Sequence, residues 1–182
     1  MYTKTFIRRA TAAVATLALV SSLHAQELTV SAAASLTNAF QTIGQAFEKT
    51  HPGIKVTFNF AASGPLLAQI QQGAPVDVFA SADQETMNRA ATAKLLADGT
   101  RVDFAQNTLV VIVPSTAAKT QLAPQTLQDL AGADFKRIAT GTPATVPVGR
   151  YTMEAVQKAG LADRLQPRWI FGESVRQVLN YV

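Results

Sequence analysis

Short segments with strand character alternate along this 182-residue chain with segments of helical periodicity. Residues 27–32 form a short run that contains β-branched residues, and Ser35 begins a helical pattern just after it. The apolar residues of that pattern recur at the 4-3-4 spacing of one helix face: Leu36, Phe40, Ile43 and Phe47. Strands that alternate with helices predict an α/β fold with mainly parallel sheets flanked by helices.

The alternation continues along the rest of the chain. Further strands are predicted at residues 54–60, 76–80, 108–114, 137–140 and 165–170. Residues 108–114 are apolar with no interruption before Pro114, which predicts a strand buried on both faces of a parallel sheet. We expect this strand to start a second series of strand–helix units, and we place a domain boundary just before it, between residues 26–104 and 105–182.

Two serines lie where a predicted strand gives way to a predicted helix. Ser35 and Ser63 each occupy this place, and Ser63 is followed by Gly-Pro. A helix N-terminus carries free N–H groups and the positive end of the helix dipole, and in parallel sheets these ends gather where ligands bind. A serine adds a hydroxyl donor without adding charge, so the pattern predicts an oxyanion site built from neutral donors. The alternative is that each serine is an ordinary N-cap, worth about 1 kcal/mol.

A second pair of polar residues has a structural interpretation. Ser81 and Asp83 precede another predicted helix, and both residue types are common helix caps. A carboxylate at this place would repel an anion, so we interpret Ser81 and Asp83 as caps.

The first 25 residues have the pattern of a secretory signal peptide. Lys4, Arg8 and Arg9 precede an apolar stretch at residues 10–20, which is shorter than the roughly 20 residues of a membrane span. We predict cleavage near Ala25 and export to the periplasm; an uncleaved anchor and twin-arginine export are alternatives. Without these residues the chain has 13 basic and 12 acidic residues, a net charge of +1. No basic stripe remains, which argues against nucleic-acid binding.

The chain offers little for catalysis or for metal coordination by side chains. It has no cysteine, and after cleavage its one histidine would be His51, in a His-Pro-Gly turn. The G-x-S-x-G motif of hydrolases is absent around the serines, and so are the glycine patterns that bind phosphate or dinucleotides. We therefore expect no enzymatic activity, no cofactor and no metal held by side chains.

Several segments resemble the periplasmic molybdate-binding proteins of ABC importers, which are type II periplasmic binding proteins. The most specific are Ala-Ala-Ala-Ser-Leu-Thr-Asn-Ala at residues 32–39 and Gly-Ala-Pro-Val-Asp-Val-Phe-Ala-Ser-Ala-Asp-Gln at residues 73–84. Weaker matches lie at residues 107–111, 146–151 and 173–176. The resemblance covers essentially all of the chain after the predicted signal peptide, in order and at similar spacing.

This resemblance implies two lobes with the ligand between them, residues 26–104 forming lobe 1 and residues 105–182 lobe 2. In such proteins two serines bind the oxyanion through hydroxyl and backbone N–H groups; they match Ser35 and Ser63. Two further backbone N–H donors match Val148 and Val175. A tyrosine hydroxyl from a later strand also binds in this family, and Tyr181 does not match it. We therefore expect the protein to continue past Val182, with the last strand of lobe 2, the return crossover and the C-terminal helices of lobe 1 still to come.

The resemblance also implies that the protein binds molybdate or tungstate and delivers it, as a monomer, to the permease of an ABC importer. One alternative is a receptor for sulfate or a small carboxylate on the same fold. A carboxylate receptor would need an arginine in the cleft, for which Arg150 and Arg176 are the candidates. Another alternative is an exported enzyme. A regulatory effector domain would lack an export signal and carry DNA-binding helices.

Overall fold

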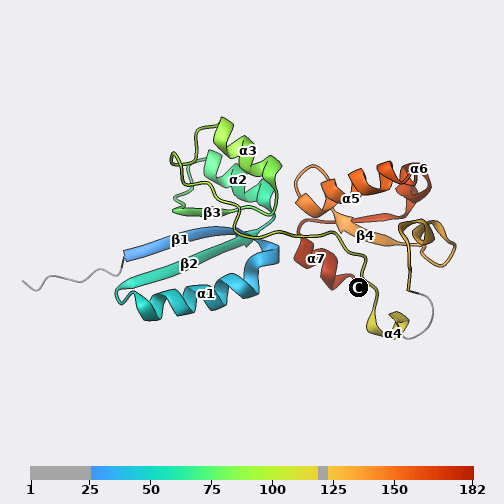
Figure 1. Cartoon of the computed structure of the whole chain (residues 1–182), viewed down its shortest axis with the longest axis horizontal. Coiled ribbons are helices and arrows are strands. Elements are labelled where there is room, and N and C mark those ends of the chain that lie inside the picture. The colour runs from blue at the N-terminus through green and yellow to red at the C-terminus, as the bar shows by residue number, and fades with distance from the viewer. Residues whose placement is uncertain (1–25, 119–122) are drawn as a thin grey trace, which may run out of the picture.

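The computed structural model describes residues 26–118 and 123–182, so the predicted signal peptide lies outside the described residues. Two parallel sheets organise this part of the chain, each with its own helices (Figure 1). We call the first sheet with its helices the first lobe and the second sheet with its helices the second lobe. Within the described residues, no helix is both long and apolar enough to cross a bilayer.

The first lobe is built on a three-stranded parallel sheet in the order β2-β1-β3. Its strands are β1 (Gln26–Ala33), β2 (Ile54–Ala61) and β3 (Val78–Ala80). Helix α1 (Thr37–Thr50) covers one face of this sheet, while α2 (Ser63–Gln71) and α3 (Gln84–Thr92) cover the other (Figure 1). The central strand β1 is buried over its last four residues, so the chain enters the turn before α1 from a fixed position.

The predicted apolar face of α1 is confirmed only in part, because Phe40 packs on the sheet whereas Ile43 is 59% exposed and Gly44 is the buried residue of the helix. The rings of Phe40 and Phe58 meet edge to face, with centroids 6.5 Å apart. Residues of β1 and β3 form the buried centre of this lobe: Val30, Ala32 and Ala80. The small alanines let the helices approach the sheet closely at the carboxyl ends of these strands.

The second lobe has a two-stranded parallel sheet of β4 (Ile138–Gly141) and β5 (Trp169–Gly172). Helix α5 (Pro147–Lys158) connects the strands, and α7 (Val175–Asn180) follows β5. The shorter elements are α4 (Ser115–Ala118), η2 (Leu127–Ala131), α6 (Ala162–Leu165) and η3 (Gln166–Arg168). Its buried core is separate from that of the first lobe and consists of Leu130, Ala131, Val156, Leu161 and Leu165.

One arginine joins several parts of the second lobe. The guanidinium of Arg168 donates hydrogen bonds of 2.6–3.2 Å to four carbonyl oxygens in or just after η2: Leu130, Ala131, Gly132 and Phe135. Carbonyl groups at the end of a helix have no N–H donor within the helix, and Arg168 supplies donors to them here. Arg168 thereby holds η2 against the start of β5.

The prediction of a strand at residues 108–114 is wrong. Residues 101–114 have no regular secondary structure, and Val110 is 69% exposed. An apolar run indicates a preference for burial, but a strand also needs a neighbouring strand for its backbone hydrogen bonds, and the described residues supply none here. The segment runs instead from the first lobe past the second (Figure 1).

The strand predicted at residues 165–170 begins later than expected. Leu165 ends α6 with its side chain fully buried, and Pro167 lies in η3. Proline fits the first turn of a helix because its N–H is not needed there. The strand itself, β5, therefore runs from Trp169 to Gly172. The other predicted strands are confirmed to within two residues at each end.

Candidate functional site

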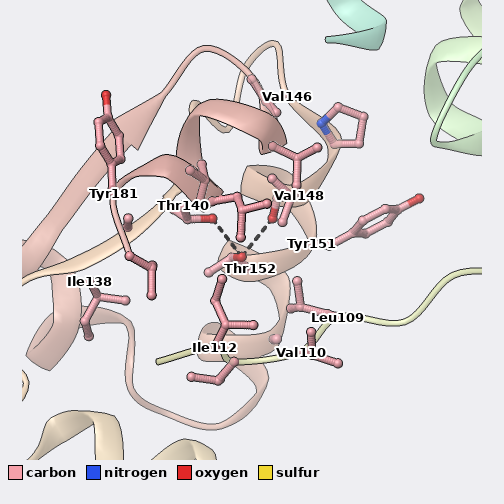
Figure 2. A pocket seen from close by; sticks show the side chains of 18 of the residues that line it. Leu109, Val110, Ile112, Ile138, Thr140, Val146, Val148, Tyr151, Thr152 and Tyr181 are labelled. Atoms are coloured by element: carbon pink, nitrogen blue, oxygen red, sulfur yellow. Dashed lines mark hydrogen bonds between the residues drawn. The ribbon is translucent and has the colours of Figure 1, made fainter. Parts of the chain in front are cut away.

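A cavity of about 1480 Å³ lies between the two lobes and extends under residues 107–114. Its walls include all four predicted donors, Ser35 and Ser63 from the first lobe and Val148 and Val175 from the second. The structure thus brings together residues that are up to 140 positions apart in sequence. One part of the cavity is apolar, with Leu109, Val110 and Ile112 facing the second lobe (Figure 2).

Ser63 is the first residue of α2 and is fully buried. It does not cap its own helix, because the N-cap residue is Ala62 and no side chain caps it. Its Oγ instead accepts a hydrogen bond from the N–H of Ala82, at 3.0 Å. That contact uses a lone pair of the hydroxyl and leaves its proton available for donation to an anion.

Ser35 lies in the short turn η1 (Ala34–Leu36), two residues after Ala33, which ends β1 and is the N-cap of η1. Its side chain is exposed on the cavity wall, and neither η1 nor α1 has a side-chain cap. The ordinary N-cap interpretation therefore fails for both serines. The two hydroxyls are held in the cavity wall without being used to cap the helices that they begin.

Val148 and Val175, the second-lobe residues that the resemblance indicates, lie at helix starts. Val148 is the second residue of α5, after Pro147, so its N–H belongs to the first turn, which lacks intrahelical acceptors. Two threonines fix this turn, because Thr152 Oγ1 donates to the Val148 carbonyl at 2.8 Å and accepts from Thr140 Oγ1 at 2.9 Å (Figure 2). The N-terminal turn of α5 is therefore tied to strand β4.

The start of α5 also depends on a glycine. A Cβ added to Gly149 would lie 2.0 Å from the carbonyl oxygen of Gly141, closer than any real contact. Only glycine lets the first turn of the helix lie this near the end of β4. Val148, the residue before Gly149, lines the cavity at this turn.

Val175 is the first residue of α7. Here a serine does cap the helix, because Ser174 Oγ accepts a hydrogen bond of 3.2 Å from the N–H of Gln177. The capping serine and the neighbouring first-turn N–H group thus have separate roles. The serine fixes the turn, and Val175 lines the cavity.

Hydrogen bonds join the two lobes beside the site. The N–H of Gly64, in the first turn of α2, donates to the carbonyl oxygen of Thr145 at 3.2 Å. Arg176 of α7 donates to Asn38 Oδ1 of α1 at 2.9 Å. The first contact joins the start of α2 to the loop that precedes α5, and the second joins α7 to α1.

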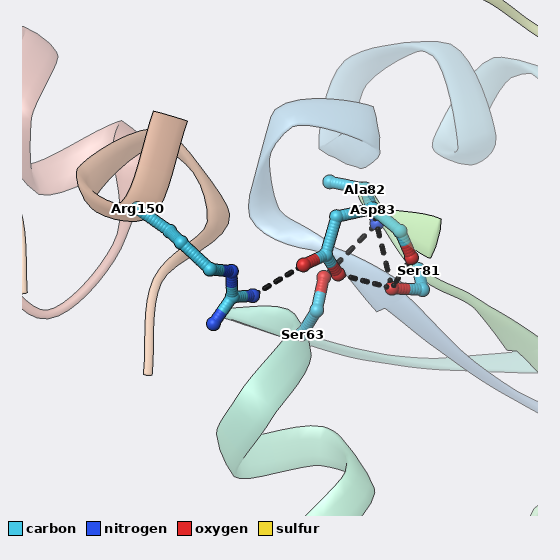
Figure 3. A network of polar contacts seen from close by, with 5 residues as sticks. All are labelled: Ser63, Ser81, Ala82, Asp83 and Arg150. Carbon is cyan, nitrogen blue, oxygen red and sulfur yellow. Dashed lines mark hydrogen bonds and ion pairs between the residues drawn. The ribbon is translucent and has the colours of Figure 1, made fainter. Parts of the chain in front are cut away.

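A charged pair also joins the lobes, and it involves Asp83, which occupies the predicted N-cap position of α3. The Asp83 side chain makes no capping hydrogen bond to α3 and pairs instead with the guanidinium of Arg150 from α5 (Figure 3). The carboxylate is fully buried and also accepts a 3.1 Å hydrogen bond from Ser81 Oγ. Their 67-residue separation carries no periodicity, so sequence reasoning could not pair Asp83 with Arg150.

Two tyrosines reach the cavity wall. Burial raises the pKa of Tyr151 above its ordinary value, and the negative charge of Asp83 adds to that shift. Tyr151 is therefore neutral at physiological pH and able to donate a hydrogen bond. Tyr181 also lines the cavity, near the apolar residues of the second lobe (Figure 2).

Groups suited to metal binding are not gathered anywhere in the described residues, where no three His, Cys, Asp or Glu side chains cluster. His51 follows α1, where its ring stacks on Phe47 with centroids 4.0 Å apart. Its Nδ1 lies 3.0 Å from Thr50 Oγ1 and 3.1 Å from the Phe47 carbonyl oxygen. His51 is therefore part of the helix end and lies away from the cavity between the lobes.

Comparison with known proteins places the chain in a family. Residues 28–182 match the model of the family described as bacterial extracellular solute-binding protein, and the chain belongs to that family. The family comprises proteins that bind solutes, which agrees at this coarse level with the expectation of a binding protein rather than an enzyme.

The relatives include several with a named ligand. The molybdate-binding protein ModA of Escherichia coli K12 is 40% identical over 157 residues, covering 86% of this chain and 61% of that protein. A putative ABC transporter substrate-binding lipoprotein, YvgL, of Bacillus subtilis is 35% identical, covering 85% of this chain and 58% of that protein. The chain therefore spans about three fifths of the length of these relatives.

Solved structures agree on the fold. The substrate-binding domain of a putative molybdenum ABC transporter from Clostridium difficile superposes with a TM-score of 0.60 at 37% identity, covering 86% of this chain and 66% of that one. The periplasmic molybdate-binding protein of Azotobacter vinelandii gives a TM-score of 0.66 at 26% identity, with coverage of 84% and 65%. These similarities confirm the predicted α/β fold with parallel sheets in two lobes; the predicted boundary near residue 104 stays a prediction.

Proposed function

We propose that this chain binds molybdate or tungstate between its lobes and delivers it, in the periplasm, to the permease of an ABC importer. The observation that carries the proposal is the convergence of Ser35, Ser63, Val148 and Val175 on one cavity. Neither serine hydroxyl caps a helix, and both valine N–H groups lie in first helical turns. The named relatives that bind molybdate support the choice of ligand.

Neutral donors suit this ligand. Molybdate is a dianion that only accepts hydrogen bonds at neutral pH, and a site made of hydroxyl and N–H donors complements it. A monoprotonated phosphate would bring a proton that no group of the site accepts, at a cost of about 1–3 kcal/mol. Sulfate carries no proton, so its exclusion would depend on the spacing of donors set for longer metal–oxygen bonds. Molybdate and tungstate are nearly equal in size, and we expect weak discrimination between them.

The positions of the arginines weigh against a carboxylate receptor. Both candidates for binding a carboxylate are already engaged across the lobes, Arg150 with Asp83 and Arg176 with Asn38. The charge of a bound anion would therefore be met by helix dipoles and hydrogen bonds rather than by a free guanidinium. We further propose that the protein acts as a monomer, without a cofactor and without metal coordination by side chains.

Calorimetric titration tests this function. The protein is titrated with sodium molybdate, tungstate, sulfate and phosphate. We expect binding of molybdate and tungstate at least a hundredfold tighter than that of sulfate or phosphate. Equal or tighter binding of sulfate or phosphate would contradict the proposal.

A further inference from the structure

The buried carboxylate of Asp83 lies close to Ser63 (Figure 3). The N–H of Ala82 holds the Oγ of Ser63 at 3.0 Å, and Asp83 is the next residue. Its side chain is fully buried, and Ser81 Oγ fixes one carboxylate oxygen at 3.1 Å. The structure therefore keeps a negative charge beside the place where the proposed function puts a dianion.

The compensating positive charge comes from the other lobe. Arg150 lies in the first turn of α5, two residues after Val148, and its guanidinium pairs with Asp83 Oδ2. Its Nε is buried and has no hydrogen-bond partner among the described residues. Asp83 is thus the group that orients the guanidinium, and the pair connects the loop behind Ser63 with the helix start that presents Val148.

Both charges act on the wall of the cavity. The pKa of Tyr151, which lines the cavity, is raised first by burial and then by the charge of Asp83, and the charge of Arg150 opposes the shift. The fields of the two groups therefore reach the cavity and partly cancel there. Without Arg150, the field of Asp83 would act on the cavity unopposed.

We propose that Arg150 is a positioning and specificity-determining residue of the oxyanion site, which neutralises Asp83 so that a dianion can bind beside Ser63. This inference rests on the proposed function. Arg150 need not touch the ligand, since it acts through the carboxylate. Because it reaches Asp83 from the second lobe, neutralisation depends on the two lobes being together, and a dianion is favoured only in that arrangement.

A cycle of substitutions tests the proposal, using sodium molybdate as the probe in calorimetric titration of this protein. Arg150→Met removes the charge but keeps an apolar stem, and we expect it to weaken molybdate binding by tenfold or more, since it leaves Asp83 unpaired. Asp83→Asn in the same protein removes the repulsion, so the double variant is expected to recover to within about threefold of the unsubstituted protein. Arg150→Lys keeps the charge and is expected to retain most of the affinity.

Arg164→Met provides the matched control. Arg164 is exposed on α6 of the same lobe and lies outside the cavity wall, so this variant loses the same charge without touching the pair. It is expected to bind molybdate as the unsubstituted protein does. Circular dichroism of every variant verifies that it is folded before titration.

Three outcomes would overturn the inference. A double variant no better than Arg150→Met would mean that Arg150 acts by joining the lobes rather than by neutralising Asp83. An equal loss in Arg150→Met and Arg164→Met would reduce the effect to net charge. Unchanged affinity in Arg150→Met would remove Arg150 from the site. Failure of the proposed function is distinguishable from all three, because the unsubstituted protein itself would then bind no molybdate.

Discussion

The two lobes contribute to the cavity in different ways. The first lobe presents serine side chains from turns fixed by a three-stranded sheet, with Ser63 held by the backbone of the 80–83 loop. The second lobe presents backbone N–H groups, and its sheet has two strands. Side-chain donors can be lost by substitution, whereas backbone donors can be moved only by displacing a helix. The first lobe is therefore sensitive at the donors themselves, and the second at the residues that place its helices.

The largest effect on stability is expected for substitution of Gly149, a glycine at the start of α5. Gly149→Ala would place a Cβ 2.0 Å from the backbone oxygen of Gly141, so α5 must move away from β4. We expect a loss of about 3 kcal/mol or more in the free energy of unfolding, together with loss of ligand binding. Urea denaturation followed by circular dichroism measures the stability.

Gly44→Ala in α1 is the first-lobe counterpart. There the added Cβ would meet the ring of Phe58 at 2.7 Å, and a side-chain ring can shift where a backbone carbonyl cannot. Alanine also favours the helix, so the free energy of unfolding should change by less than about 1 kcal/mol. A cost equal to that of Gly149→Ala would contradict the claim that the second lobe is the more sensitive to helix placement.

The next effect tests the arginine that joins the second lobe. Arg168→Met removes hydrogen bonds to four carbonyl oxygens around η2, and we expect the free energy of unfolding to fall by about 2–3 kcal/mol. Arg164→Met, which removes a charge from the neighbouring helix α6, should change it by no more than about 0.5 kcal/mol. Similar losses in both variants would mean that Arg168 acts through charge alone.

Substitutions of the two serines are expected to differ in their effect on stability but not in their effect on binding. Ser35→Ala and Ser63→Ala should each weaken molybdate binding about tenfold or more, since each removes a donor to a charged ligand. Only Ser63→Ala should also lower the free energy of unfolding, by about 1 kcal/mol, because it leaves the N–H of Ala82 without its acceptor. Titration and urea denaturation of both variants give the two quantities. Unchanged affinity in either variant would exclude that serine from the site.

The smallest expected effect is on the pH dependence of stability, and it involves one carboxylate from each lobe, Glu48 and Asp129. Backbone N–H donors lower the pKa of both groups, from Val56 for Glu48 and from Thr126 and Gln125 for Asp129. A lowered pKa in the folded state means that the stabilisation is present above the ordinary pKa near 4 and is lost as the pH falls through the folded value. Glu48→Gln and Asp129→Asn should therefore destabilise at pH 7 and progressively less towards pH 3. A deficit that does not shrink with acid would assign the effect to geometry rather than charge.

The sequence predicts the first lobe better than the second. Residues 26–92 have clear alternation, and their strands pair with one another, so local pattern and final structure agree. Residues 108–114 have an equally clear apolar pattern, yet no described strand pairs with them. An apolar sequence pattern indicates which residues prefer burial. Whether they form a strand depends on a neighbouring strand that can pair with them.

In the candidate site, too, local features could be predicted from the sequence and contacts between distant residues could not. Serines after strands and helix starts after loops were predicted from local signals, and the structure places all four donors on one cavity. The pairing of Asp83 with Arg150 was missed, because a contact between residues 67 positions apart depends on how two lobes meet. Asp83 was interpreted as a cap from its position before α3, which is a local argument, and a contact across the lobes overrode it.

The central claim is that neutral donors from both lobes hold the anion together. The most direct measurement is a molybdenum anomalous difference map from crystals of the protein grown with molybdate. We predict one peak in the cavity, with oxyanion oxygens within hydrogen-bonding distance of the Ser35 and Ser63 hydroxyls and of the N–H groups of Val148 and Val175. A peak held by a guanidinium, by the donors of one lobe alone or outside the cavity would contradict the account.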